Sequence, residues 1–120
     1  GTQLKDNVRD LHTAEIKEVH MRIACPPLTY PCEFLNFSRS RSNLDLATHK
    51  AVKQLTGKDE NDMKEYSDNN NDKYKEMVEQ IRKNLDLTTL EYQKLPDLID
   101  AIGLPKEKVC THCWNGSSYF

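Results

Sequence analysis

The sequence predicts an α/β fold in which helices flank short strands and the last residues form an irregular, cysteine-bearing tail. Two patterns support this prediction. Near the N-terminus, the periodicity of an amphipathic helix gives way within a few residues to the alternation of a strand. A further helix, strand and helix follow in the second half of the chain. Such alternation is typical of α/β domains, and 120 residues suffice for one domain at most.

The first helix is predicted over residues 3–14. Its apolar positions recur at i, i+4 and i+7, namely Leu4, Val8 and Leu11. Residues 19–25 then alternate between apolar and other side chains, which indicates a strand that Pro26 and Pro27 end. The helix and strand are therefore expected to be direct neighbours along the chain.

A loop and a second helix are predicted next. Residues 28–37 show no sustained period, and we expect their aromatic side chains to be buried anchors: Tyr30, Phe34 and Phe37. Residues 43–56 are expected to be helical, because Ser42 and Asp45 have capping-box spacing and Gly57 ends the pattern. The apolar stripe of this helix comprises Leu44, Ala47, Ala51, Val52 and Leu55.

Residues 58–72 form a strongly polar segment in which only Met63 and Tyr66 are apolar. Such a composition buries too little apolar surface to order a chain on its own. The segment is therefore predicted to be an exposed, mobile insertion in the domain.

The second half resumes regular patterns. Helical spacing over residues 73–84 is followed by a Thr-rich, strand-like run at 87–92. A short helix is predicted over residues 95–102, with Pro96 in its first turn and Gly103 past its end. The cysteine-bearing tail comes after it.

Bulk composition excludes several classes of protein. The net charge of −2 and pI near 6.1 give no overall attraction to nucleic acid. A mean hydropathy of −0.80, without any apolar run of roughly 18 residues, argues against a membrane protein. No signal peptide is visible, so we expect a cytoplasmic protein with reduced thiols.

The four cysteines are the clearest chemical signal. Cys110 and Cys113 have the C-x-x-C spacing that directs two thiolates at one soft metal. Structural thiols, a redox dithiol and a zinc site made from all four cysteines are alternatives. A redox dithiol is less favoured because there is little room for the helix that usually follows one. Cys25 continues the apolar side of the predicted strand and is interpreted as a core residue.

Other motifs are weaker. The Arg/Ser run at residues 37–42 is interpreted as a polar loop before a helix. Gly1 and Thr2 precede an amphipathic helix, as the end of a phosphate-binding loop would, but two residues at a helix N-terminus are weak evidence for such a loop. His12, His20 and His49 are interpreted as surface or packing residues. His112 is a weak candidate for a hydrogen-bond donor to a metal ligand. No catalytic residue is assigned, since neither a Ser-His-Asp order nor paired carboxylates are visible.

Taken together, several strings resemble the C-terminal quarter of the glutamine phosphoribosylpyrophosphate amidotransferase family, also called amidophosphoribosyltransferase. They are Gly1-Thr2-Gln3, Lys17-Glu18-Val19-His20-Met21-Arg22-Ile23-Ala24, Pro26-Pro27, Tyr30-Pro31-Cys32, the run from Leu98 to Pro105, and Cys110-Thr111-His112-Cys113-Trp114-Asn115-Gly116. The resemblance covers residues 1–37 and 85–116. It implies the C-terminal part of a type I phosphoribosyltransferase-like domain.

This resemblance implies specific sites. Gly1, Thr2 and Gln3 match the end of the loop that holds the sugar 5′-phosphate of phosphoribosyl pyrophosphate, which binds with Mg²⁺. Cys32, Cys110 and Cys113 match three of the four ligands of a [4Fe-4S] cluster, and the fourth lies upstream in the family. Glu15 departs from the family pattern, which has Gly at the end of the first helix, so Glu15 is expected to adopt a left-handed conformation unless that turn is rebuilt.

The resemblance also implies a function and partners. The parent enzyme is expected to make 5-phosphoribosylamine from phosphoribosyl pyrophosphate and glutamine, the first step of purine biosynthesis. Residues 1–120 are then inactive alone and need the remainder of the enzyme, including a glutaminase domain, in a homo-oligomer. No nucleic acid or membrane partner is expected. The alternative function is a free-standing zinc-binding interaction module that uses all four cysteines.

Overall fold

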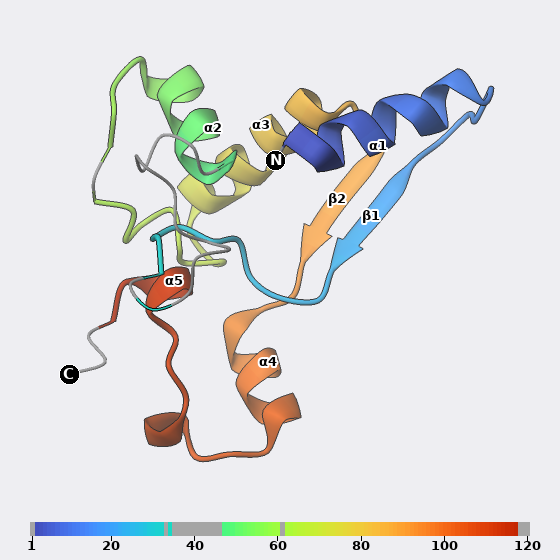
Figure 1. Cartoon of the computed structure of the whole chain (residues 1–120). Coiled ribbons are helices and arrows are strands. Elements are labelled where there is room, and N and C mark those ends of the chain that lie inside the picture. Colours follow the sequence, from blue (N-terminus) through green and yellow to red (C-terminus); the bar gives the residue numbers. More distant parts are fainter. Residues whose placement is uncertain (1, 33, 35–46, 61, 118–120) are drawn as a thin grey trace.

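The computed structural model describes residues 2–32, 34, 47–60 and 62–117. Its elements are α1 (Thr2–Thr13), β1 (His20–Ile23), α2 (Ala47–Thr56), α3 (Asp72–Leu85), β2 (Thr89–Tyr92), α4 (Leu95–Ile102), the 3-10 turn η3 (Lys106–Lys108) and α5 (His112–Asn115). Helices and strands thus follow the order that the sequence predicted (Figure 1). The predicted cap at Ser42 and Asp45, the Arg/Ser run and Phe37 lie outside the described residues.

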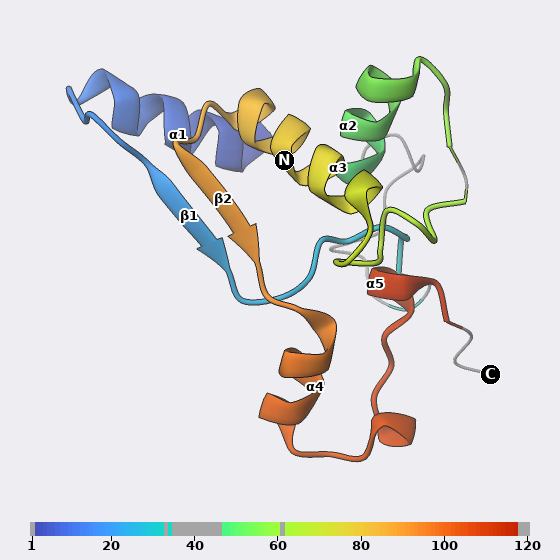
Figure 2. The same ribbon diagram turned by 180° about the vertical axis from the view of Figure 1, so that it is seen from behind.

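A two-stranded parallel sheet organises one end of the molecule. His20 of β1 pairs with Thr89 of β2, and Ile23 pairs with Tyr92. The connection from β1 to β2 passes through α2 and α3, as a parallel pair requires a crossover. Seen from behind, α1 and α3 lie along the sheet, whereas α4 projects away from it (Figure 2). The mixed helix and strand content confirms the predicted α/β class.

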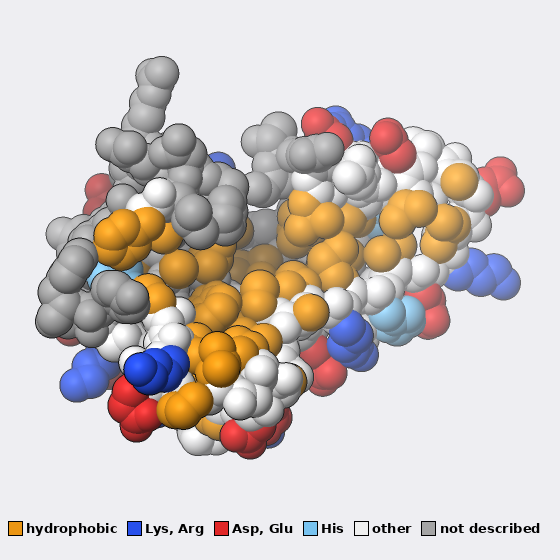
Figure 3. Space-filling model, turned by 60° about the horizontal axis from the view of Figure 1, so that its bottom comes forward, with side chains coloured by type: hydrophobic (Ala, Val, Ile, Leu, Met, Phe, Trp, Pro, Cys, Tyr) orange, Lys and Arg blue, Asp and Glu red, His pale blue; other side chains and the backbone are white. Residues whose placement is uncertain are grey.

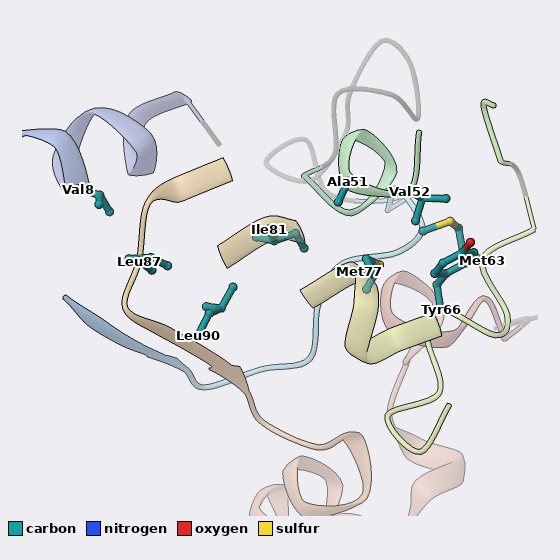
Figure 4. Close-up of a cluster of buried hydrophobic side chains, with 9 residues drawn as sticks. All are labelled: Val8, Ala51, Val52, Met63, Tyr66, Met77, Ile81, Leu87 and Leu90. Carbon is teal, nitrogen blue, oxygen red and sulfur yellow. The ribbon is translucent and has the colours of Figure 1, made fainter. Parts of the chain in front are cut away.

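The core extends along α3 rather than over the sheet alone. Its buried residues are Val8, Ala51, Val52, Met63, Tyr66, Met77, Ile81, Leu87 and Leu90. Figure 4 shows Val8, Leu87 and Leu90 at one end of this cluster and Val52, Met63 and Tyr66 at the other, with α3 between them. Helix α3 therefore links the sheet to α2.

Residues 58–72 depart in part from the prediction of an exposed insertion. Met63 is fully buried and Tyr66 is almost so, and both belong to the core. Their burial is possible because they join the same cluster as residues of α2 and α3, beside Val52 in Figure 4. The expectation of exposure is wrong at these two residues, while the mobility of the segment stays a prediction.

Helix α2 uses its polar residues where an apolar stripe was expected. Ala51 and Val52 are buried as predicted, but Ala47 is exposed and Leu55 is 42% exposed. Thr48 and His49 are buried instead. The Thr48 hydroxyl donates to the carbonyl of Leu28 at 2.6 Å, and Nε2 of His49 donates to that of Thr29 at 2.7 Å. Hydrogen bonding to the loop after β1 thus decides which face is buried.

Two helix ends place a non-glycine residue in the left-handed region. Glu15 has φ 63°, which confirms the expectation for this departure from glycine. Asp86 caps α3 with φ 55°, and its N–H donates to the carbonyls of Arg82 and Lys83. Asp tolerates this conformation better than Glu, because its short side chain bonds locally. Glu15 is therefore the more strained of the two.

Helix α4 has the predicted bounds, and Gly103 ends it with φ 78°. None of its residues is buried, although its composition is apolar. On the face seen in Figure 3, hydrophobic side chains gather in a broad band. Among the described residues, no helix has both the length and the apolar character needed to cross a membrane.

Candidate functional site

The tail docks on the loop that follows β1, and this contact builds the candidate site. The backbone N–H groups of Thr29 and Tyr30 both donate to the carbonyl of Cys113, at 2.8 and 3.0 Å. The Thr29 hydroxyl donates to the carbonyl of Trp114 at 2.8 Å. Thr29 is fully buried, and its carbonyl accepts a hydrogen bond from His49, so the loop is anchored to α2 where the tail binds to it.

The Tyr30 side chain makes the main side-chain contacts between the loop and the tail. Its hydroxyl accepts a hydrogen bond from the N–H of Met63 at 3.2 Å, and its ring lies 5.8 Å from that of His112. Burial raises the pKa of the Tyr30 phenol. A Cβ on Gly116 would lie 2.7 Å from two Tyr30 ring carbons. Gly116 therefore lets the backbone approach the ring closely, and its φ of 72° also favours glycine.

A single helical turn, α5, shapes the tail between its cysteines and Gly116. The N–H of Gly116 donates to the carbonyl of His112 at 2.7 Å, which closes the turn. Nδ1 of His112 donates to the carbonyl of Ser117 at 2.9 Å. As expected, there is little room for a helix after the cysteines, and α5 is a single turn of four residues. The His112 imidazole has a backbone partner.

Three cysteines meet where the tail touches the loop. The thiols of Cys32 and Cys113 are hydrogen-bonded, and Cys110 also interacts electrostatically with Cys113. Burial is the main cause that raises the pKa of Cys113, and the neighbouring sulfurs of Cys32 and Cys110 add to it. The N–H of Phe34 donates to Sγ of Cys32 at 3.4 Å. The structure thus brings together residues far apart in sequence.

Phe34 and Cys25 lie on either side of this loop, and neither is buried as fully as the sequence predicted. Phe34 was expected to be a buried anchor but is 59% exposed, so that expectation is wrong. Its backbone N–H contacts the site. Cys25 interacts electrostatically with Tyr92 at the end of β2, and burial raises the pKa of its thiol. Cys25 lies two residues beyond the end of β1 and is half-buried, so it is not part of the buried core, and its electrostatic neighbour is Tyr92 of the sheet rather than the three-cysteine group.

The three cysteine thiols are not arranged as ligands of a single metal ion. Within the described ranges, no three His, Cys, Asp or Glu side chains are arranged to hold a single metal ion. Cysteine thiolates are the ligands that hold iron–sulfur clusters, and Cys32, Cys110 and Cys113 would supply three of them. The donor set of thiols, with an N–H directed at one sulfur, fits an iron–sulfur cluster in chemistry.

The phosphate-binding residues are only partly described. Gly1 lies outside the described residues, and of Thr2 and Gln3 the structure gives only their place in the first turn of α1. Figure 1 places this end of α1 beside α3. The predicted contact with phosphate therefore stays a prediction.

Thr29, Thr48 and His49 support the site and were not predicted from the sequence. A weak signal existed: Thr29 is a polar residue inside a Pro-rich loop that was expected to be ordered. The indole N–H of Trp114 is buried without a hydrogen-bond partner in the described part of the chain. A buried donor of this kind costs stability unless an acceptor is supplied.

Two hollows lie near functional elements. A space of about 650 Å³ adjoins the exposed Cys110 and is lined by Lys106, Glu107, Val109, Cys110, Thr111, Asn115 and Ser117. A smaller one of about 230 Å³ lies between α1 and the end of α3. The first places the Cys110 thiol within reach of a small molecule.

Comparison with known proteins gives one relationship of note. No protein family model matches the chain, and no solved structure matches it. The amidophosphoribosyltransferase of Methanothermobacter thermautotrophicus is 29% identical over 116 residues. The match covers 97% of this chain but 19% of the relative, so the chain spans about a fifth of that protein's length. These findings support a distant relation between this chain and amidophosphoribosyltransferase.

Proposed function

We propose that this chain is the C-terminal part of an amidophosphoribosyltransferase, which makes 5-phosphoribosylamine from phosphoribosyl pyrophosphate and glutamine in purine biosynthesis. The observation that carries the proposal is the contact between Cys32 and Cys113, which are far apart in the sequence, together with the electrostatic interaction of Cys110 with Cys113. The distant relative of that name supports it independently. The three cysteines are then ligands of a [4Fe-4S] cluster, with a fourth supplied from outside these residues.

The role of the cluster in this proposal is structural. The tail buries few of its own side chains, and its contact with the loop rests mainly on backbone hydrogen bonds. Ligation of Cys32 together with Cys110 and Cys113 adds a covalent link across the same contact, and metal binding free energy becomes folding free energy. The Phe34 N–H that donates to Sγ of Cys32 would stabilise the thiolate form of this ligand.

The N-terminal residues provide the proposed substrate contact. Thr2 and Gln3 follow Gly1 at the start of a twelve-residue helix without an acidic side chain in its first turn. Backbone N–H groups and the helix dipole at such a position favour the 5′-phosphate of phosphoribosyl pyrophosphate, whose pyrophosphate would carry Mg²⁺. Their contribution is to position the sugar and balance charge as ammonia displaces pyrophosphate at C1.

Uncovered apolar surface favours a larger parent protein. Parallel sheets are normally covered on both faces, and two strands alone are marginal. In the described part of the chain the sheet has two strands, and no residue of the apolar helix α4 is buried. The remainder of the enzyme, including the glutaminase domain that supplies ammonia, would cover these surfaces in a cytoplasmic homo-oligomer. The residues of this chain are then inactive alone.

The test uses the complete natural polypeptide that contains this sequence. We expect formation of phosphoribosylamine that depends on glutamine, Mg²⁺ and phosphoribosyl pyrophosphate. Thr2→Ala should weaken the affinity for phosphoribosyl pyrophosphate, whereas Thr13→Ala at the other end of α1 is the matched control. Absence of this activity in the complete protein, or equal affinity in both variants, would contradict the respective part of the proposal.

A zinc-binding module remains the alternative, favoured by the three thiols but weakened by Cys25, which interacts with Tyr92 instead. Stoichiometric zinc in the 120-residue chain that is lost in Cys25→Ser would favour it. Zinc that is absent, or that persists in this variant, would argue against a site built from all four cysteines.

A further inference from the structure

The three cysteines of this group differ in exposure. Cys110 is exposed and borders the 650 Å³ hollow. Cys113 is half-buried and interacts with both other thiols, while Cys32 is half-buried and hydrogen-bonded to Cys113. Cys110 is therefore the most accessible of the three thiols to a reagent in solvent, and it alone of the three borders the hollow.

We propose that, when no metal is bound, Cys110 is a site of thiol–disulfide exchange with a small peptide disulfide, and that exchange ends in a disulfide between Cys32 and Cys113. This inference goes beyond the proposed function. It needs the three thiols and not the enzyme activity or the cluster.

The steps balance without any reagent other than the peptide disulfide RSSR. The Cys110 thiolate attacks one sulfur of RSSR, which forms the mixed disulfide at Cys110 and releases one thiolate. Cys113 then attacks Sγ of Cys110 and releases the second peptide thiolate. Finally Cys32 attacks Sγ of Cys113, and Cys110 leaves as a thiolate. Two protein thiols are oxidised, and one RSSR is reduced to two thiols.

The hollow suits a zwitterionic peptide. Its wall carries Lys106 and Glu107 beside Cys110, so one cation and one anion face the same space. A peptide such as glutathione has carboxylate and ammonium groups that complement this pair by charge-assisted hydrogen bonds. The exchange is thereby directed to Cys110 by charge as well as by exposure.

The product joins two segments that are already in contact. Thr29 and Tyr30 hold the carbonyl of Cys113 at 2.8 and 3.0 Å, and Cys32 follows Tyr30 by two residues. The link ties the tail to the loop in the same way as the proposed cluster. It would protect the two inner thiols while the metal is absent.

The experiment treats the complete natural polypeptide, reduced and free of metal, with oxidised glutathione and maps its disulfides by mass spectrometry of proteolytic peptides. We expect the Cys32–Cys113 disulfide in the unaltered chain. Cys110→Ser should slow its formation about tenfold or more, since the accessible nucleophile is lost. Cys113→Ser should retain glutathione on Cys110, and Cys32→Ser should stop at Cys110–Cys113.

Cys25→Ser is the matched control, because Cys25 is half-buried and interacts with Tyr92. It should react as the unaltered chain does. Reaction of Cys25 at the rate of Cys110, an unchanged rate in Cys110→Ser, or a final Cys110–Cys113 disulfide in the unaltered chain would each overturn the proposal. Iron analysis is a separate measurement, so failure here is distinguishable from failure of the proposed function.

Discussion

Gly116→Ala should loosen the tail from the loop, and the size of the effect follows from the backbone and from Tyr30. An alanine at φ 72° costs about 1–2 kcal/mol relative to an ordinary conformation, from which about 0.4–1 kcal/mol is recovered in the unfolded chain. Its Cβ would lie 2.7 Å from two ring carbons of Tyr30, well inside the optimal separation. Overpacking of this kind adds about 1–3 kcal/mol.

The total is about 1–4.6 kcal/mol, which corresponds to a loss of roughly fivefold to two thousandfold in the equilibrium that docks the tail. Hydrogen exchange measures this directly. The amide hydrogens of Thr29 and Tyr30 bond to the carbonyl of Cys113, so their protection reports docking. We expect that protection to fall by the same factor in Gly116→Ala.

Gly103→Ala is the matched control. Gly103 has φ 78°, but no atom lies within 4 Å of the position that an alanine Cβ would take, so only the backbone cost of about 1 kcal/mol applies. Because Gly103 ends α4, its effect on the amides of Thr29 and Tyr30 should be small. Equal loss of protection in the two variants, or none in Gly116→Ala, would refute the reasoning about Tyr30.

Three further predictions concern the rest of the fold. Glu15→Gly should raise the free energy of unfolding by about 0.5–1 kcal/mol in urea titrations, since φ 63° favours glycine, and Glu15→Ala should not. Met63→Ala should lower it by about 2–5 kcal/mol because the side chain is fully buried, and a change below about 1 kcal/mol would show that residues 58–72 do not pack as described. Burial is the main cause that raises the pKa of Tyr92 to about 12, so its phenol should be the last to ionise in an ultraviolet titration. Because the pKa is higher in the folded state, the stability that the neutral phenol contributes should be complete below about pH 10. It should be lost as the pH rises from about 10 to 12.

The sequence was a good guide where structure depends on neighbours along the chain. The bounds of α4 follow from Pro96 and Gly103, which act locally, and the left-handed Glu15 follows from the helix end that it occupies. It failed where a distant partner decides burial. Met63 is one of two apolar residues in a polar segment, and it is buried in the same cluster as residues of α2 and α3.

The same distinction holds for the candidate site. Cys110 and Cys113 are neighbours whose spacing alone suggested a shared role. Cys32 was joined to them by family resemblance and not by spacing, and the structure pairs its thiol with Cys113. The support from Thr29 and His49 could not be predicted, because their hydrogen bonds connect the loop after β1 to residues much later in the chain.

Iron and sulfide analysis of the complete natural polypeptide, purified without oxygen, tests the central claim most directly. We expect about four iron atoms and about four sulfides per polypeptide, retained in Cys25→Ser and lost in Cys113→Ser. Cys25 serves as the control because it interacts with Tyr92 rather than with the three-cysteine group. Zinc without iron, or full iron content in Cys113→Ser, would contradict the claim that Cys32, Cys110 and Cys113 are cluster ligands.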